Sequence, residues 1–166
     1  MCIRDRLEDI VCSLQDQGVQ RVVFSNGHLE PAHVQVLRGV LLDHAERGKG
    51  RAHVIYPDNT RRRFAETLGD EFKSGECHAG RYETSIVLAA DANSVRMHEA
   101  EKLPPLEIQL IEKMKTGVKS FKDAGADQAY CGDPAQATAA EGGELIERLA
   151  DMIVTSVEET WPELFA

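Results

Sequence analysis

Residues 19–28 read VQRVVFSNGH, an apolar run that gives way to a short polar segment. The run from Val19 to Phe24 predicts a buried β-strand, and residues 25–28 predict the tight loop at its carboxyl end. Side chains in such loops can converge on a ligand, because crevices open at the carboxyl ends of parallel strands. This stretch therefore predicts a sheet and also the edge of that sheet where chemistry is expected.

Helices and strands alternate around this run. A helical pattern precedes it and ends at Gly18, a second helix begins near Pro31 and closes at Gly48, and residues 51–56 predict a second strand. This alternation is typical of crossovers in a parallel sheet that helices cover on both faces. We therefore expect an α/β fold with a mostly parallel sheet.

The rest of the sequence is mainly helical in pattern. Pro104-Pro105 separates two of the predicted helices, and neither an internal repeat nor a second domain is evident. The predicted segments are a short helix at 61–68, a glycine-containing loop at 69–75, and helices at 83–95, 106–114 and 137–160.

The composition is that of an ordinary soluble globular protein. The chain of 166 residues is long enough for one domain, with 42% hydrophobic and 28% charged residues. A formal net charge of -9 argues against a nucleic-acid partner, because phosphate binding requires clustered cations. The sequence shows no membrane span, no signal peptide and no paired cysteine spacing. We expect a cytoplasmic protein with no nucleic-acid and no membrane partner.

The first residues depart from this pattern. Residues 1–6 read MCIRDR and resemble the translation of a sequencing-adapter remnant, so we predict that they are a non-native leader. The helix that follows leads directly into a strand, which is rarely how a domain starts. Residues 7–166 are therefore expected to be the C-terminal part of a single α/β domain that is incomplete at its N-terminus.

The first candidate site is the loop after the first strand. Gly27 allows a sharp turn, after which His28 and Glu30 offer an imidazole nitrogen and a carboxylate to one cavity. Such nitrogen and oxygen ligands suit zinc or manganese. The alternative is structural, since Asn26-Gly27 is a favoured turn dipeptide and Glu30 is well placed at a helix N-terminus. On spacing alone the structural interpretation is favoured.

The second candidate site is residues 76–85, which read ECHAGRYETS. An imidazole such as that of His78 can act as acid or base near neutral pH beside a bound metal. In the alternative interpretation, Thr84 or Ser85 caps a helix. Glu83 then interacts with the helix dipole, and His78 is a surface loop residue. The residues alone leave both interpretations open.

The third cluster, residues 132–142, predicts a strand end, a proline-set turn and a capped helix. Asp133 could orient a ligand or a neighbouring loop, although an Asp before Pro is more often part of a turn. Cys77 lacks an evident base aimed at it, which a catalytic thiol requires. The remaining histidines are expected to be solvated or to pack within elements: His33, His44, His53 and His98.

These three clusters, in this order, resemble the creatininase family of amidohydrolases. Residues 26–30 are similar to the family's Asn-Gly-His loop, residues 78–85 to its second block, and residues 132–134 to its third. The match runs from about Val19 to the C-terminal helix. The resemblance implies a three-layer α/β/α fold that holds two divalent metals, zinc or manganese or both.

The resemblance also implies a role for each matching residue. His28 corresponds to a ligand of one metal, and Glu30 to a residue that can ligate the other. His78 corresponds to the catalytic histidine, so His78 and Glu30 are the catalytic candidates. Supporting roles are implied for the remaining matches: Asn26, Gly27, Glu83 and Asp133.

The implied activity is hydrolysis of a C–N bond, often in a small or cyclic amide, through a metal-bound water. His28 and Glu30 would fix the metals, and His78 would relay a proton to the leaving nitrogen. The implied partner is a small-molecule amide substrate. The family's tendency to assemble implies a homo-oligomer.

The family also draws a glutamate, a histidine and a bridging aspartate from an N-terminal segment that has no counterpart in this sequence. We therefore expect the 166-residue chain to be inactive by itself. Missing strands would leave apolar surface in water at a cost of roughly 25 cal/mol per Å². Poor stability or aggregation is the expected consequence.

The sequence departs from true creatininases in two places. The segment before His78 lacks the tryptophans of the creatinine pocket, so ring opening, deformylation and peptide cleavage are all open as activities. Leu29 and Pro31 differ from the commoner form of the first loop, which makes Glu30 the less secure ligand. The single tryptophan, Trp161, is expected to pack or to form an oligomer contact.

Two alternatives do not invoke metals. A small doubly wound hydrolase would use Ser25 or Cys77 as its nucleophile, but the G-x-S-x-G elbow is missing from the sequence. A metal-free flavodoxin-like module would bind a small ligand or a regulatory partner at the strand-end loops. Metal-dependent turnover separates the amidohydrolase from both.

Overall fold

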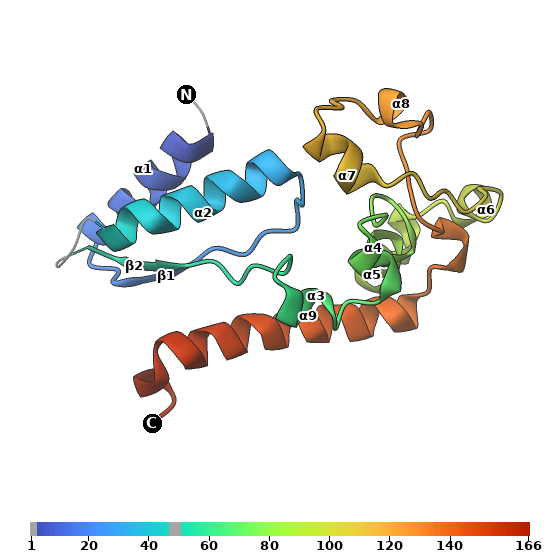
Figure 1. The fold of residues 1–166 in the computed structure, drawn as a ribbon. Coiled ribbons are helices and arrows are strands. Elements are labelled where there is room, and N and C mark those ends of the chain that lie inside the picture. Colours follow the sequence, from blue (N-terminus) through green and yellow to red (C-terminus); the bar gives the residue numbers. More distant parts are fainter. Residues whose placement is uncertain (1–2, 47–50) are drawn as a thin grey trace. The chain divides into compact units, whose positions relative to one another are not determined.

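The computed structural model of the chain describes residues 3–46 and 51–166 (Figure 1). The chain divides into two compact units. The first unit is Met1–Asp58 with Thr155–Ala166, and the second is Asn59–Val154. The organisation as one domain stays a prediction.

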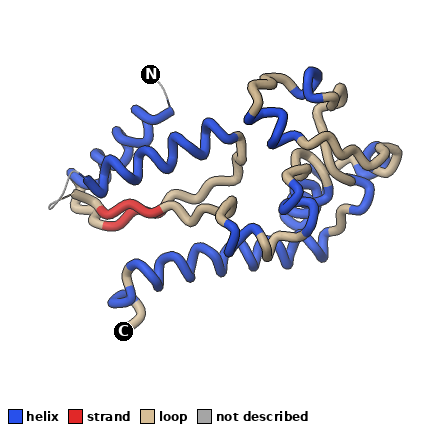
Figure 2. Tube along the Cα trace, viewed as in Figure 1, coloured by secondary structure: helices blue, strands red, loops and turns tan. Residues whose placement is uncertain are grey.

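The first unit contains a two-stranded parallel sheet (Figure 2). Strand β1 pairs with β2 in parallel, and Val22 lies opposite Val54. Helix α2 connects the two strands, as the alternating pattern predicts, although its predicted end at Gly48 lies outside the described residues. In chain order the elements are α1 (Ile3–Asp16), β1 (Arg21–Val23), α2 (Pro31–Glu46) and β2 (His53–Ile55).

Apolar residues at helical spacing hold α1 and α2 against this sheet. Val11 of α1 is fully buried in a cluster with Val54 of β2. Val34 and Leu37 of α2 form a second cluster with Tyr56, which follows β2. Full burial of one such side chain stabilises a fold by about 1.5–3 kcal/mol. These contacts fix the start of α2 beside the first candidate loop.

Helix α1 begins at Ile3, earlier than the start near Leu7 that the apolar pattern predicts. It therefore includes residues 3–6 of the predicted leader, and Arg4 forms an ion pair with Asp43 of α2. The first two residues lie outside the described part of the chain. The non-native origin of residues 1–6 stays a prediction.

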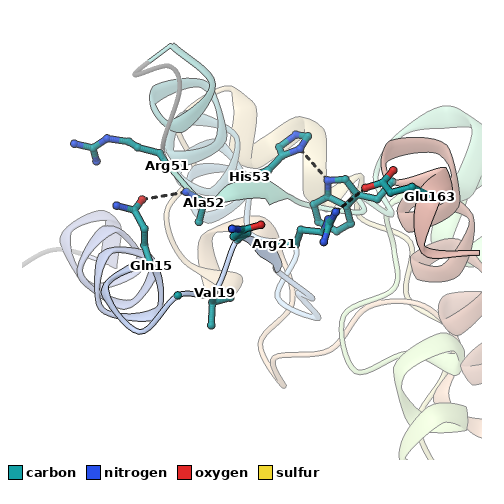
Figure 3. Close-up of a pocket in the computed structure, with 10 residues that line it drawn as sticks. Gln15, Val19, Arg21, Arg51, Ala52, His53 and Glu163 are labelled. Carbon is teal, nitrogen blue, oxygen red and sulfur yellow. Dashed lines mark hydrogen bonds and ion pairs between the residues drawn. The ribbon is translucent and has the colours of Figure 1, made fainter.

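The C-terminal residues of the first unit pack on the start of its sheet. The Trp161 indole N–H donates to His53 Nδ1 at 2.9 Å, which confirms the predicted packing role of Trp161. Arg21, which pairs with His53 across the sheet, forms an ion pair with Glu163 at 2.7 Å. These residues and Gln15 line a cavity of about 520 Å³ (Figure 3). It lies at the amino ends of the strands, opposite to the edge where catalytic loops are expected.

The second unit is helical in its described part, apart from an isolated antiparallel bridge between Leu106 and Gly132. Helix α9 begins in this unit, and its last turns and η3 (Pro162–Leu164) belong to the first unit. The elements are α3 (Arg62–Ala65), α4 (Asp70–Ser74), α5 (Arg81–Ala90), η1 (Ala92–Ser94), α6 (Met97–Ala100), α7 (Leu110–Lys115), α8 (Phe121–Ala124), η2 (Pro134–Gln136) and α9 (Ala139–Thr160).

Local backbone chemistry explains where this unit differs from the predicted elements. The predicted loop at 69–75 contains α4, because Gly69 and Gly75 both take positive φ, 93° and 81°, and bound a helical turn between them. Helix α5 ends at Ala90, before the predicted residue 95. The Asp91 side chain accepts a backbone N–H of the next segment and starts a new turn there.

Helix α9 matches the helix predicted at 137–160. Thr138 Oγ1 accepts the backbone N–H of Glu141 at 3.2 Å, so the predicted capped start is confirmed. None of the described helices combines the length and the apolarity that a membrane crossing requires. The paired strands and helices agree with the α/β class, while the three layers and the incomplete N-terminus stay predictions.

Candidate functional site

The first candidate loop follows β1, and the Asn26 side chain sets its conformation. The Asn26 amide accepts the backbone N–H of His28 at 3.2 Å and donates to the backbone carbonyl of His28 at 2.7 Å. One side chain therefore binds both polar backbone groups of His28. The turn predicted from Asn26-Gly27 is present, and His28 is exposed beyond it.

Glu30 occupies the start of α2, as its position in the sequence predicts. Glu30 Oε2 accepts the backbone N–H of His33 at 2.7 Å, which satisfies one of the free N–H groups in the first helical turn. A carboxylate can bind through either oxygen, so this contact leaves Oε1 available as a ligand for a cation. Glu30 can therefore serve both the helix and a metal.

His33 joins this loop, although the sequence predicts a solvated or packing residue. Its Nε2 lies 3.0 Å from Asn26 Oδ1, and its ring meets the His28 ring edge-on with centroids 5.1 Å apart. The turn at Gly27 and the first turn of α2 bring position 33 back towards position 28. A histidine in the first helical turn after such a loop is the signal that would have identified it.

The second candidate histidine lies in the second unit, between α4 and α5. The His78 ring stacks on Phe121 of α8, with centroids 4.3 Å apart and planes 19° apart. Its Nδ1 lies 3.9 Å from Glu83 Oε2, and 41% of its side chain is exposed. An imidazole that is open to solvent and close to a carboxylate can take up and release a proton.

The start of α5 differs from the predicted capping. Gly80 is the residue before the helix, and neither Thr84 nor Ser85 caps it. Glu83 Oε2 instead accepts the backbone N–H of Ala79 at 2.7 Å, where Ala79 has an unusual φ of 48°. Glu83 therefore fixes the loop that carries His78.

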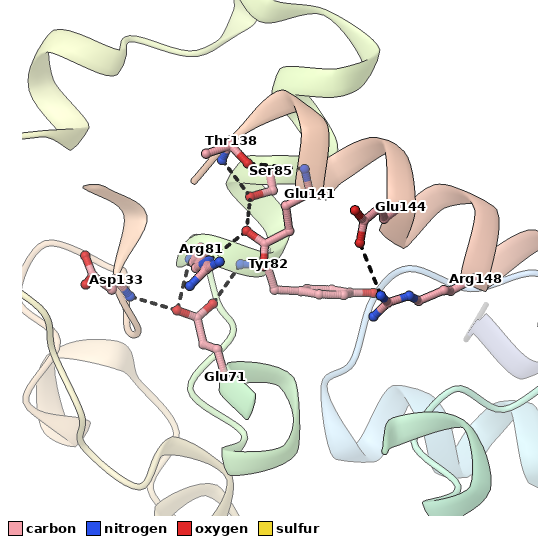
Figure 4. Close-up of polar contacts among 9 residues, drawn as sticks. All are labelled: Glu71, Arg81, Tyr82, Ser85, Asp133, Thr138, Glu141, Glu144 and Arg148. Atoms are coloured by element: carbon pink, nitrogen blue, oxygen red, sulfur yellow. Dashed lines mark hydrogen bonds and ion pairs between the residues drawn. The ribbon is translucent and has the colours of Figure 1, made fainter. Parts of the chain in front are cut away.

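Glu71 of α4 ties the His78 loop to the loop of the third cluster, a role that sequence reasoning missed. Its carboxylate accepts the backbone N–H of Arg81 at 3.0 Å, of Tyr82 at 2.8 Å and of Asp133 at 2.8 Å (Figure 4). The first two groups open α5, where a negative charge is favoured.

Two glycines make room for this carboxylate. A Cβ at Gly80 would lie 2.6 Å from Glu71 Oε1, and a Cβ at Gly132 would overlap the same carboxylate. Gly132 also takes a φ of 93°, which disfavours other residues. The glycines in the second and third blocks thus indicate that another group lies close to the backbone there, but they do not identify it as Glu71.

Asp133 begins the predicted proline turn, since η2 starts at Pro134. Its Oδ1 is buried and has no hydrogen-bond partner among the described residues. A buried carboxylate oxygen without a partner is costly, because its hydration is lost without replacement. Asp133 is therefore a candidate acceptor for a proton, a substrate group or a cation.

Cys77, beside His78, is not suited to act as a nucleophile. Burial, with a smaller contribution from the nearby Glu83 carboxylate, raises the pKa of its thiol from 9.0 to about 12. The thiol is therefore protonated at neutral pH, whereas nucleophilic attack requires the thiolate. The doubly wound hydrolase with Cys77 as nucleophile loses its support.

A cavity of about 440 Å³ opens beside the His78 loop within the second unit. This volume falls in the range of sites for small organic molecules. Its lining is mostly apolar with a few charged groups and includes Ala79, Glu83, Val87, Val95, Arg96 and Leu103.

Residues 2–157 match the family model for creatininase, described as creatinine amidohydrolase. The chain belongs to the creatininase family. Within this creatininase-family chain, His28 and Glu30 belong to the first unit, while His78, Glu83 and Asp133 belong to the second. Among the described residues, no three or more His, Cys, Asp or Glu side chains lie together in a group that could hold a metal.

Relatives of this creatininase-family chain include a peptidase. The mycofactocin precursor peptide peptidases of two Mycobacterium tuberculosis strains, CDC 1551 / Oshkosh and ATCC 25618 / H37Rv, are each 33% identical to it over 91 residues. The match covers 54% of this chain and 35% of each peptidase. The chain therefore matches about a third of the length of these relatives.

Solved creatininases share its fold. A mutant creatininase of Zn-Zn type has a TM-score of 0.67 at 19% identity, and creatinine amidohydrolase (creatininase) has a TM-score of 0.64 at 18% identity. Each match covers 96% of this chain and 63% of the solved chain. The chain is thus a hydrolase-family member that spans under two thirds of those structures.

Proposed function

We propose that this protein acts as a metal-dependent amidohydrolase that cleaves a C–N bond in a small amide. The loop after β1 carries the proposal, because it offers the His28 imidazole and the Glu30 carboxylate at the carboxyl end of a parallel strand. Ligand sites of open α/β sheets occur at this edge. A metal-free flavodoxin-like module finds no support in the family match.

The donor set fits a divalent transition metal. His28 is exposed, and Glu30 uses only Oε2 in its contact with His33, so a nitrogen and an oxygen remain for coordination. Zinc and manganese both accept such ligands, and a structurally similar creatininase is of Zn-Zn type. A bound divalent metal lowers the pKa of a coordinated water towards about 7. We infer two metals per complete site.

His78 is proposed to relay the proton. Hydrolysis of an amide adds water across the C–N bond, so the leaving nitrogen must gain a proton. The stacked Phe121 ring fixes the plane of His78, and the Glu83 carboxylate lies 3.9 Å from its Nδ1. His78 can therefore donate to the leaving nitrogen and then recover a proton from water.

The proposed substrate is a small amide, either cyclic or at the end of a peptide. The cavity beside the His78 loop has apolar walls that suit a compact organic group. One relative is named for a precursor peptide, and the solved structures are creatininases, so both kinds of amide are candidates. The lack of tryptophan in residues 59–77 disfavours creatinine itself.

A three-layer fold, a homo-oligomer and a cytoplasmic location complete the proposal. They follow from the family resemblance and from the composition. Size-exclusion chromatography with light scattering tests the oligomer, since a monomer at all concentrations would contradict it.

The test of function uses the complete gene product, because this chain covers only 63% of each solved creatininase. Cyclic amides, N-formyl compounds and short peptides are incubated with the protein and Zn²⁺ or Mn²⁺, and new amines are quantified. We expect turnover that a chelator abolishes and added metal restores. Turnover that persists after complete metal removal would contradict the proposal.

A further inference from the structure

His33 has no role in the metal site proposed above, yet its contacts reach the centre of the loop. We propose that His33 is a positioning residue of the metal loop, which acts through Asn26 to hold His28 in place. The inference rests on the proposed function insofar as His28 is a metal ligand. The structural part of the inference, that His33 fixes the conformation of the loop through Asn26, can be tested without metal.

The Asn26 amide orientation follows from its partners. The Asn26 Nδ2 donates to the His28 carbonyl, and its Oδ1 accepts the His28 N–H. The Tyr56 hydroxyl lies 3.5 Å from Nδ2, at the limit of a hydrogen bond. Rotation of the amide would place its NH₂ group against the His28 N–H and its oxygen against the carbonyl. The backbone at His28 therefore follows the orientation of this amide.

His33 fixes that orientation from the helix. Since Asn26 Oδ1 can only accept, the His33 Nε2 at 3.0 Å must carry the proton and donate. The His33 backbone N–H is bound by Glu30 Oε2, and its ring meets the ring of His28. His33 thus contacts both proposed ligands and the amide between them.

Helix α2 gives His33 a rigid base. The neighbouring Val34 is 4% exposed and Leu37 is 3% exposed in the cluster with Tyr56. Ligands held by a packed helix are positioned more reproducibly than ligands on a free loop. Residues that orient a ligand without touching the metal commonly raise metal affinity about 10–100-fold.

The Nε2 of His33 is used by Asn26 Oδ1, so this nitrogen is not available to a metal and instead connects His33 to the amide that binds His28. The described residues also contain no preformed group of three metal-binding side chains. His33 lies outside the three sequence blocks that resemble the family, so its role is inferred only from its contacts in this loop.

The first experiment measures solvent exchange of the His28 backbone amide by NMR in the metal-free 166-residue chain. We expect His33→Phe, which keeps a ring but removes the donor, to speed exchange about fivefold, as loss of one hydrogen bond predicts. His33→Gln, whose amide can donate to Asn26, should restore slow exchange. Unchanged exchange in His33→Phe overturns the inference. His98→Phe, at an exposed histidine, is the matched control.

The second experiment measures Zn²⁺ affinity in a double-mutant cycle. Both His33→Phe and Asn26→Ala should weaken binding about 10–100-fold, and the double variant should be no weaker than Asn26→Ala alone. Additive losses would overturn action through Asn26. If the unmodified chain binds no Zn²⁺, the proposed function fails for this chain, while the amide-exchange result still decides whether His33 holds the loop.

Discussion

The Glu71 carboxylate accepts the backbone N–H of Asp133 at 2.8 Å, across 62 positions of sequence. The same carboxylate binds the first two N–H groups of α5, so one side chain sets the spacing of two family blocks. The Glu76 carboxylate, 4% exposed, does the same for the α7 segment by accepting the N–H groups of Ile108 and Leu110. Carboxylates that accept backbone N–H groups, rather than a sheet, organise this part of the chain.

Glu71→Ala should lower the free energy of unfolding by about 3 kcal/mol, because it leaves three backbone N–H groups without their acceptor. Urea unfolding followed by circular dichroism measures the change. Glu112→Ala, which removes an exposed glutamate that pairs with Lys115, is the control and should change stability by under about 0.5 kcal/mol. Equal stability of the two variants would contradict this account of the loops.

Arg38→Met should destabilise the protein by about 2 kcal/mol. Arg38 donates to Asp58 Oδ2 from Nε at 2.9 Å and from Nη2 at 2.6 Å, and the Asp58 side chain is only 6% exposed. The substitution removes two hydrogen bonds and the Arg38 charge from a buried carboxylate. Arg62→Met is the control, because its pair with Glu66 is exposed and should contribute under about 0.5 kcal/mol. A similar loss of stability in both variants would contradict the larger contribution expected from the Arg38–Asp58 pair.

Cys77 should make stability fall at high pH. Its folded pKa, raised by burial from 9.0 to about 12, lies above that of the unfolded thiol. The part of the unfolding free energy that depends on the protonated Cys77 thiol is therefore fully present below pH 9. It is lost as the pH rises from 9 towards 12, at up to about 1.4 kcal/mol per pH unit. We expect Cys77→Ala to flatten the decline of unfolding free energy between pH 9 and 11. An identical slope in both proteins would contradict burial of this thiol.

His78→Gln should lower kcat about 10²–10⁴-fold in the complete enzyme while Zn²⁺ binding is unchanged, because proton transfer is lost and the ligands are intact. Steady-state kinetics of the best substrate, together with metal content, provide the measurement. Phe121→Leu should lower kcat by less, since it frees the ring of His78 without removing it. Full turnover in His78→Gln would exclude the relay.

Much of the first unit could be predicted from the sequence. The apolar run after Gly18 predicts β1, and the apolar stripe after Pro31 predicts α2. Both predictions hold because the apolar residues that form these patterns are also the ones that pack in the core. The second unit was harder, since α4, α6 and α8 are helices of four or five residues with too few apolar positions to show a period. Their ends depend on single backbone conformations, such as those at Gly69 and Gly125.

The candidate site could be predicted only in part. The roles of His28, Glu30 and His78 stay predictions that rest on the family resemblance, because spacing alone favours a turn at the first loop and leaves His78 open. Glu71 could not be found, because it pairs with backbone N–H groups that any sequence supplies. His33 was missed because its partner, Asn26, becomes a neighbour only after the turn has formed.

The central claim is that His28 and Glu30 bind a divalent metal. Isothermal titration of Zn²⁺ into the complete gene product, compared with its His28→Ala and Glu30→Gln variants, tests it most directly. We expect binding to the unmodified protein and at least about tenfold weaker binding to each variant, with the fold unchanged by circular dichroism. Equal Zn²⁺ affinity in all three proteins, or no binding to any of them, would contradict the claim.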